Sequence, residues 1–151
     1  MARTGGTKHG EYIVKNRDKY IGTKMPKYRS SWEERWCYWF DHNNNVIKWG
    51  FEMLTIPYFY QVDKKTHRYI TDFYAEIKDN KGEIRKYVIE VKPYQQTLLP
   101  KAPKNQNKKA QNRYLTEMTT FVKNKNKWDS AIAYCEKKGL RFMILTEKSM
   151  F

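Results

Sequence analysis

Alternating apolar and polar residues over positions 69–92 predict a β-hairpin. The turn is signalled by residues 79–82 (Asp-Asn-Lys-Gly), because Gly82 can adopt the left-handed backbone conformation that closes a three-residue loop. A loop of that length fixes the pairing of the two strands and places Asp72 directly opposite Glu90. Carboxylates that face each other on a sheet repel, so this register predicts a cation between them.

The same register divides the hairpin into a core face and a second, more polar face. A shift of one residue would separate Asp72 from Glu90 and would expose a row of aromatic side chains, so the apolar pattern itself favours the register. Lys92 follows Glu90 by two residues and therefore projects from the face of both acids. The core face is expected to hold Phe73, Ala75, Ile77, Tyr87, Ile89 and Val91, and the second face Ile70, Asp72, Tyr74, Glu76, Lys86, Val88, Glu90 and Lys92.

The chain before the hairpin predicts one helix and two strands. Ser30 or Ser31 can cap a helix that ends near Asp41, with a glutamate three residues further on to complete a capping box. Strands are expected over residues 46–50 and 53–60, and Pro57 marks the second as an edge strand or a strand end. Residues 61–68 read as a polar turn. The buried stripe of the helix is expected to hold Trp32, Trp36, Trp39 and Phe40.

After Lys92 the pattern predicts a proline-interrupted loop, two helices and a strand. The helices are expected over residues 108–123 and 127–138, with Gly139 as the C-terminal cap, and the strand over 140–146. The order of elements indicates an α/β fold with a mixed central sheet flanked by helices. The expected buried positions are Leu115, Met118 and Val122 in the first helix and Trp128, Ile132 and Cys135 in the second.

Composition adds a strong positive charge to this picture. The 151 residues carry a formal net charge of +14 at pH 7, which favours a polyanionic partner such as nucleic acid or an acidic membrane. No apolar run approaches the roughly 20 residues that span a bilayer, and the N-terminus has no apolar signal segment. The expected partner is therefore nucleic acid, with no membrane.

The cysteines and histidines do not predict a zinc site or a His-Asn-His nuclease. Cys37 and Cys135 both lie among apolar residues, which favours buried free thiols over a disulfide. They lack CxxC spacing, and the three histidines are scattered along the chain. His42-Asn43 lacks a second histidine at a suitable distance.

Basic segments stand on both sides of the hairpin. Residues 1–29 are rich in Gly, Lys and Arg and predict an arm that lies on a phosphate backbone, with a solvated tail as the alternative. Residues 30–151 are then expected to form a single domain. The second segment follows the hairpin and has no acid among its cations. The candidate DNA-binding residues are Arg29, Lys101, Lys104, Lys108, Lys109 and Arg113.

Asp72 and Glu90-Val91-Lys92 form the candidate reaction centre. Mg²⁺ prefers oxygen ligands and usually takes one or two carboxylates together with water and substrate phosphate. Such a metal can activate water and neutralise a scissile phosphate, and Lys92 can orient that water or stabilise the developing charge. The alternative is a surface ion pair, because Glu-x-Lys triplets are common. Glu33 leans toward the core and is either a helix cap or a site residue.

These residues resemble the PD-(D/E)xK nucleases, whose restriction-endonuclease-like core has an acidic helix before such a hairpin. Thr71 stands where that family often has proline. A fuller resemblance, to the head completion nucleases of T4-like tailed bacteriophages, covers nearly the whole chain. It is carried by residues 28–33, 56–58, 69–74, 90–93 and 145–148. The Arg-Ser-x-x-Glu and Asp…Glu-x-Lys pieces are also similar to the N-terminal nuclease domain of the TnsA transposition endonuclease.

The resemblance implies a DNA endonuclease that depends on Mg²⁺ or Mn²⁺ and acts on phage DNA during head maturation. It makes Asp72, Glu90 and the Val91 carbonyl metal ligands, Lys92 the catalytic lysine, and Glu33 an added acid at the metal. Glu52 and Gln95 or Gln96 are further neighbours of this site on thinner grounds.

The family also implies a place for the protein and further partners. It acts in the host bacterial cytoplasm during phage assembly and docks at the portal, in the head–neck region of the virion. Cutting both strands with one such site favours a homodimer. The main alternative is a structural DNA-binding or neck protein that keeps a nuclease fold without turnover, and RNA processing is a poorer one.

Overall fold

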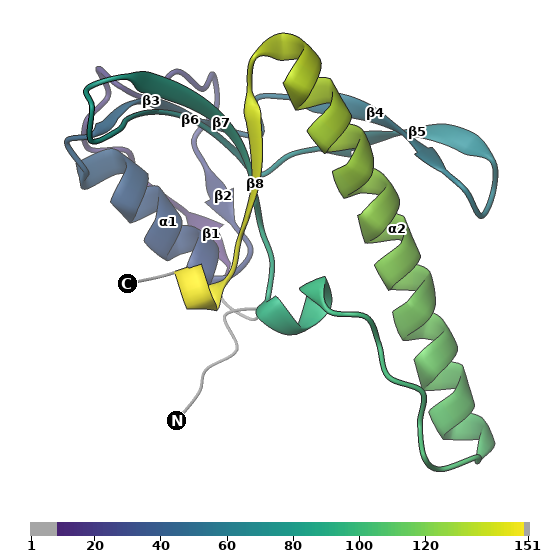
Figure 1. The fold of residues 1–151 in the computed structure, drawn as a ribbon. Coiled ribbons are helices and arrows are strands. Elements are labelled where there is room, and N and C mark those ends of the chain that lie inside the picture. The colour runs from purple at the N-terminus through teal and green to yellow at the C-terminus, as the bar shows by residue number, and fades with distance from the viewer. Residues whose placement is uncertain (1–8, 150–151) are drawn as a thin grey trace.

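The computed structural model describes residues 9–149, and its helix α1 (Ser31–His42) covers one face of a four-stranded sheet (Figure 1). The Ser30 hydroxyl accepts a hydrogen bond from the Glu33 N–H at 3.1 Å, so the predicted N-cap is confirmed. The Glu33 carboxylate accepts from the Arg29 N–H at 3.1 Å, one residue before the partner of a standard capping box. Trp36 and Phe40 are buried as expected.

The central sheet is mixed, as predicted, with strand order β3-β6-β7-β8. Its strands are β3 (Val46–Phe51), β6 (Phe73–Lys78), β7 (Ile84–Val91) and β8 (Arg141–Leu145). Only the β7–β8 pair is parallel. In the β6–β7 hairpin Phe73 pairs with Ile89 and Lys78 with Ile84, which confirms the predicted register. Gly82 has a φ of 81°, the conformation that its place in the turn requires.

Two apolar clusters lie on the two faces of this sheet. On the α1 side, Phe73, Ala75, Ile89 and Val91 of the hairpin pack with residues of α1 and β3, so the predicted core face is confirmed. On the other side, Val88 packs with helix α2 (Lys108–Lys138) and with the strands β4 (Thr55–Tyr60) and β5 (Lys65–Ile70). The sheet is therefore covered on both faces.

Strand β5 corrects two sequence predictions. Residues 65–70 pair with β4 in a separate two-stranded sheet, so the polar turn expected over 61–68 is wrong in its second half, and Ile70 is not part of the β6–β7 hairpin. Backbone hydrogen bonds can pair a polar strand whatever its side chains, and His67 also stacks on Tyr58 at 5.6 Å between ring centroids. Pro57 lies in β4, which has one strand partner, as expected for an edge position.

Helix α2 is continuous, so the two separate helices expected over 108–123 and 127–138 are wrong. The polar stretch between them contains neither Gly nor Pro, and the Asn126 side chain accepts a hydrogen bond from the Gln61 N–H at 2.9 Å. Leu115 and Ile132 are 62% and 46% exposed, contrary to prediction, and the first half of α2 extends beyond the sheet (Figure 1). Gly139 ends the helix with a φ of 72°, as predicted.

The N-terminal segment packs on the α1 side from residue 9 onward. It forms strands β1 (Gly10–Glu11) and β2 (Lys27–Tyr28), and Val14 is buried in the core. The fully buried Asp41 carboxylate accepts hydrogen bonds from the Tyr12 hydroxyl and the Lys15 and Asn16 N–H groups at 2.7–2.9 Å. Residues 1–8 of the predicted arm lie outside the described residues, and the division at residue 29 stays a prediction.

Two further observations concern the chain as a whole. Cys37 and Cys135 are buried free thiols, as predicted. Within residues 9–149 no helix has the length and apolar character needed to cross a bilayer.

Candidate active site

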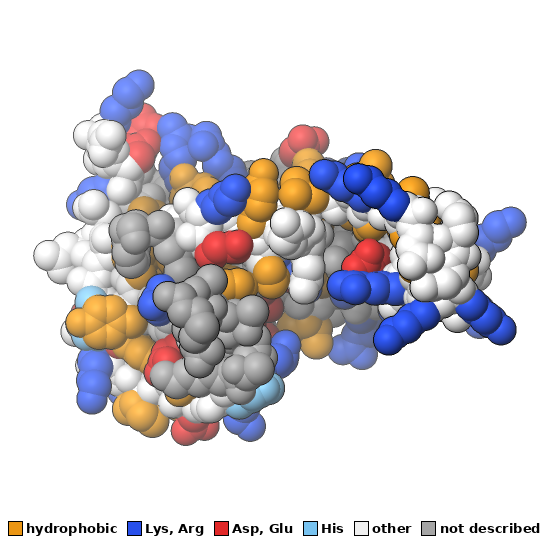
Figure 2. Space-filling view, turned by 90° about the horizontal axis from the view of Figure 1, so that it is seen from below, with side chains coloured by type: hydrophobic (Ala, Val, Ile, Leu, Met, Phe, Trp, Pro, Cys, Tyr) orange, Lys and Arg blue, Asp and Glu red, His pale blue; other side chains and the backbone are white. Residues whose placement is uncertain are grey.

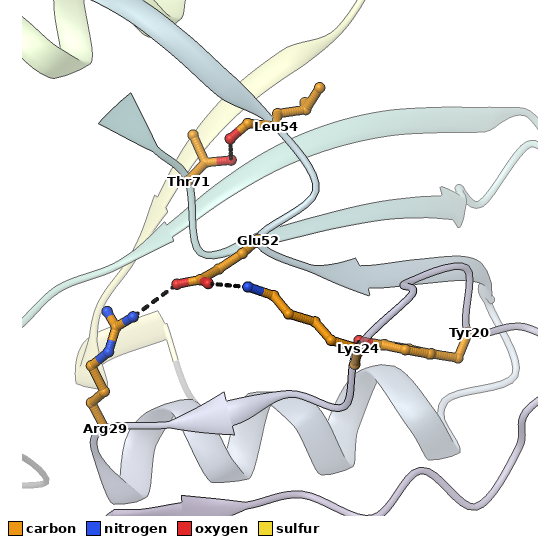
Figure 3. A network of polar contacts seen from close by, with 6 residues as sticks. All are labelled: Tyr20, Lys24, Arg29, Glu52, Leu54 and Thr71. Carbon is orange, nitrogen blue, oxygen red and sulfur yellow. Dashed lines mark hydrogen bonds and ion pairs between the residues drawn. The ribbon is translucent and has the colours of Figure 1, made fainter. Parts of the chain in front are cut away.

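The backbone at Asp72 lies where the chain leaves the β4–β5 sheet and enters the central sheet. The buried Thr71 donates its N–H to the Leu54 carbonyl at 3.2 Å, and the Asp72 carbonyl accepts from the Glu52 N–H at 2.9 Å. Figure 3 shows Thr71 beside Leu54 at this crossing. A proline has no N–H to donate, so the Thr71–Leu54 hydrogen bond gives a physical reason against proline at this position. The crossing thus fixes the backbone from which the Asp72 side chain projects.

The Asp72 and Glu90 carboxylates are each held by one protein donor. Asp72 Oδ2 accepts the Val91 N–H at 2.8 Å. Glu90 is only 6% exposed, and its Oε1 accepts the Tyr69 hydroxyl at 2.6 Å. Lys92 Nζ lies 3.5 Å from Glu90 Oε2. The structure therefore brings Asp72, Glu90 and Lys92 together, as the hairpin register requires.

The two acids have too little positive charge around them. Burial raises the pKa of Asp72 well above its usual range, and the negative charge of Glu90 raises it further. The Val91 N–H and the Lys92 ammonium oppose this rise without cancelling it. A cation between the two carboxylates would remove the repulsion that the sequence register predicts.

Glu33 reaches this site from the first turn of α1. Burial raises the pKa of Glu33, against the opposing Arg29 N–H bond and the Arg29 charge, and Glu90 raises it further. Glu33 is thus close enough to sense the charge of Glu90. However, no three His, Cys, Asp or Glu side chains among residues 9–149 stand together at metal-ligand spacing. The ligand role of Glu33 stays a prediction.

The donor set nevertheless fits a hard divalent cation. Mg²⁺ usually takes one or two carboxylates and fills its other positions with water and substrate oxygens. The protein donor on each carboxylate occupies one oxygen, so Asp72 Oδ1 and Glu90 Oε2 accept no hydrogen bond from the described residues. Lys92 is the single described cation at Glu90 Oε2, at a distance longer than a good charged hydrogen bond.

Tyr69 is the site residue that the sequence did not reveal. It is 3% exposed, belongs to β5, and holds Glu90 from outside the central sheet. Its ring packs edge to face against Tyr58, with 6.5 Å between the centroids. The hairpin pattern gave no sign of this contact, because that pattern assigns Tyr69 to the strand of Asp72. A sheet change at Thr71 was needed to turn its hydroxyl onto Glu90.

Glu52, predicted as a neighbour of the site, joins the N-terminal segment to the Asp72 backbone. Its carboxylate bridges Lys24 Nζ at 2.9 Å and an Arg29 guanidinium nitrogen at 2.8 Å (Figure 3). Its backbone adopts a φ of 49°, which is uncommon for a residue other than glycine. The carboxylate therefore pairs with the basic segment, and Glu52 is joined to Asp72 by a backbone hydrogen bond. Arg29, a candidate DNA contact, has part of its charge neutralised here.

Gln95 and Gln96 lie on η2 (Tyr94–Thr97), the short 3₁₀ helix that follows Lys92. With part of α2 they line a cavity of about 900 Å³. The Tyr94 N–H donates to the Glu147 carboxylate at 2.8 Å, and Lys148 Nζ lies 3.8 Å from the centre of the Tyr94 ring. These contacts hold the chain after Lys92 in place. The cavity is lined by neither Asp72 nor Glu90 nor Lys92, so a place for the glutamines beside the site stays a prediction.

Three of the candidate DNA-binding residues line one groove. Lys101, Lys109 and Arg113 surround a groove of about 370 Å³ at the start of α2, where Figure 2 shows Lys and Arg side chains around the helix end. Arg113 also lies 3.6 Å from Glu117. Lys104 and Lys108 are exposed and do not line the groove. The structure thus groups these cations about the first half of α2, and their contact with DNA stays a prediction.

Comparison with known proteins points to nucleases. Residues 43–147 match the family model described as "TnsA-like endonuclease N terminal". The chain is also similar to the "Head completion nuclease" of Enterobacteria phage T4, with 37% identity over 142 residues that cover 93% of this chain and 92% of the relative. The residues matched by the family model include Asp72, Glu90 and Lys92 but not Glu33.

Proposed function

The chain belongs to the family of TnsA-like endonuclease N-terminal domains, and on that premise we propose that it hydrolyses DNA phosphodiester bonds with the help of Mg²⁺ or Mn²⁺. The observation that carries the proposal is the pair of carboxylates beside Lys92, each held by one protein donor and short of positive charge. A buried pair of repelling acids costs stability, and its position at the crossing between two sheets matches a site built for a cation.

Each residue of the site has a separate role in the proposed reaction. Asp72 and Glu90 bind the cation, with the Val91 carbonyl and Glu33 as further ligands. The chemistry that such a cation supplies when bound is charge neutralisation at the scissile phosphate and a lowered pKa of water. Lys92 contacts the attacking water or the phosphate oxygens as negative charge develops. The Val91 N–H and the Tyr69 hydroxyl keep the two carboxylates in place.

The name of the phage relative supports a role in head completion. Beyond that name, we place the reaction after DNA packaging, in the host cell, with docking at the portal as a second role. DNA lies along the basic start of α2, where Lys101, Lys104, Lys108, Lys109 and Arg113 contact its phosphates, and Arg29 contacts it from the N-terminal segment. A homodimer would let two such sites cut both strands.

A plasmid assay tests the proposal. Purified protein is expected to nick or linearise supercoiled DNA with Mg²⁺ or Mn²⁺ and to leave the DNA uncut in EDTA. Asp72→Ala, Glu90→Ala and Lys92→Ala are each expected to abolish cutting while the affinity for DNA survives, and Glu76→Ala serves as a control on the same hairpin. If the wild type binds DNA and never cuts it, the protein is a structural DNA-binding component. If the variants cut normally, the site is elsewhere.

A further inference from the structure

Two lysines on α2 rest on tyrosine rings of the β4–β5 sheet. Lys127 Nζ lies 5.4 Å from the centre of the Tyr69 ring and 5.9 Å from that of Tyr58. Lys123 Nζ lies 5.4 Å from the centre of the Tyr60 ring. The two lysines are four residues apart, so they project from the same side of the helix. An ammonium within about 6 Å of an aromatic ring is attracted to the face of that ring.

Lys127 forms no ion pair among the described residues. It is half-buried, yet no carboxylate of residues 9–149 lies within ion-pair distance of its ammonium. Burial lowers the pKa of Lys127, Lys92 and Lys123 lower it further, and the charges of Glu90 and Asp72 act in the opposite direction. Lys125, two residues away, faces elsewhere and lies 3.4 Å from Asp129. Lys127 thus loses part of its hydration and feels charges of both signs, but it forms no ion pair with a described residue.

Tyr69 connects this lysine to the candidate active site. The ring that carries Lys127 also donates its hydroxyl to Glu90 at 2.6 Å. Lys92 lies beside the carboxylates, and Lys127 and Lys123 follow on α2, with Lys127 close enough to feel the charges of Lys92 and Glu90. Lys123 and Lys127 repel each other unless an anion lies against them. An aromatic ring face attracts an ammonium group but leaves its three N–H groups able to donate hydrogen bonds to a phosphate.

We propose that Lys127 binds an internal phosphate of the DNA strand beside the scissile one, with Lys123 extending the same contact by one helical turn. The proposal rests on the proposed function, because it names where the substrate backbone lies. The phosphate would supply the missing negative charge, and the tyrosine rings would hold the ammonium ready for it. Neither lysine belongs to the Glu-x-Lys motif, and only the packing of α2 on β4 brings Lys127 to the site.

The test is a salt titration of DNA binding in EDTA, which does not depend on cleavage. Binding of a duplex oligonucleotide is measured for wild type, Lys127→Gln, Lys127→Arg and the control Lys125→Gln. Loss of one phosphate contact should make the slope of log K against log salt shallower by about 0.9. Lys127→Gln should show this change, Lys127→Arg should keep the wild-type slope, and Lys125→Gln should match wild type.

Several outcomes would overturn the proposal. A wild-type slope for Lys127→Gln would assign the lysine to packing on the rings, and an equal change for Lys125→Gln would mean a diffuse charge effect. A loss confined to duplexes with 5′-phosphate ends would assign a terminal phosphate instead of an internal one. If Lys127→Gln does not fold, the salt slope of Lys123→Gln tests the same phosphate contact, because the exposed Lys123 side chain can be removed without disturbing the core. A wild-type slope for that variant would then overturn the proposal.

Cleavage separates this inference from the proposed function. If the wild type cuts DNA, Lys127→Gln should raise KM more than it lowers kcat, since the contact is made in the ground state. If the wild type never cuts, the proposed function fails, while the salt slope still decides whether Lys127 contacts phosphate.

Discussion

Replacing Tyr69 by phenylalanine tests whether Glu90 is held for metal binding. The change removes one hydroxyl and leaves the ring, so the contacts of Tyr69 with Tyr58 and Lys127 persist. Glu90, only 6% exposed, loses its 2.6 Å donor and keeps Lys92 at 3.5 Å. The perturbation is therefore confined to the orientation and the charge balance of one carboxylate.

The magnitude follows from the charge on the acceptor. A hydrogen bond to a charged group contributes about 1.5–3 kcal/mol, and loss of a partner that orients a metal ligand typically costs about 10- to 100-fold in metal affinity or activity. For a chain of this size each kcal/mol shifts Tm by roughly 2–4 °C. Tyr69→Phe should therefore melt several degrees lower in EDTA and should need about tenfold or more Mg²⁺ or Mn²⁺ for half-maximal cleavage.

The matched control is Tyr58→Phe. Tyr58 is also buried in the β4–β5 sheet, and its hydroxyl has no hydrogen-bond partner among the described residues. Metal titrations of plasmid cleavage and thermal melts in EDTA are compared for both variants. If Tyr69→Phe needs no more metal than wild type, or if Tyr58→Phe shows the same loss, Tyr69 does not position Glu90 and its role is packing alone.

Three further changes test other parts of the structure. Asp72→Asn should melt at a higher temperature than wild type in EDTA at pH 8, because it removes a buried charge that faces Glu90. The pKa of Asp72 is raised in the folded protein, so the wild type loses stability as pH rises through that pKa and the carboxyl ionises. The difference in melting temperature between Asp72→Asn and wild type should therefore be smaller at pH 5 than at pH 8. A variant that melts below wild type at pH 8 would contradict the repulsion. Asp41→Asn should lower the free energy of unfolding by about 2–4 kcal/mol in urea titrations, because three donors to the carboxylate lose a charged acceptor. Burial alone would raise the pKa of Asp41, but its hydrogen bonds lower that pKa. The ionised carboxylate therefore stabilises the folded protein above the pKa of the unfolded chain, and this stabilisation is lost as pH falls through the pKa of the folded protein. Equal stability of Asp41→Asn and wild type at pH 7 would contradict this. Gly139→Ala should cost about 1 kcal/mol in the same titration, because alanine is strained at a φ of 72°, whereas Gly139→Asn should cost less; equal stabilities would mean that the helix end relaxes.

Local pattern determined the parts of this protein that depend on period and turn chemistry. The alternation over residues 69–92 fixed the hairpin register and with it the meeting of Asp72 and Glu90, because a strand has only two faces and only one register buries the apolar one. The sequence also predicted a serine cap at residue 30 or 31 and the helix end at Gly139, since each satisfies backbone groups within one turn of the helix.

The sequence misled where a local signal competed with distant contacts. The polar residues 124–126 looked like a break in α2, yet Asn126 bonds to Gln61 at the end of β4, and nothing near Asn126 in the sequence announces that partner. The same holds for residues 65–70, which form a strand because β4 offers a free edge.

The surroundings of the two acids were decided by the tertiary structure alone. Tyr69 reaches Glu90 because the chain changes sheets at Thr71, and Lys127 reaches Tyr69 because α2 packs on the same strands. Contacts between residues far apart in sequence have no period and no motif, so the sequence by itself determined which carboxylates meet, and packing determined which groups hold them and which cations face them.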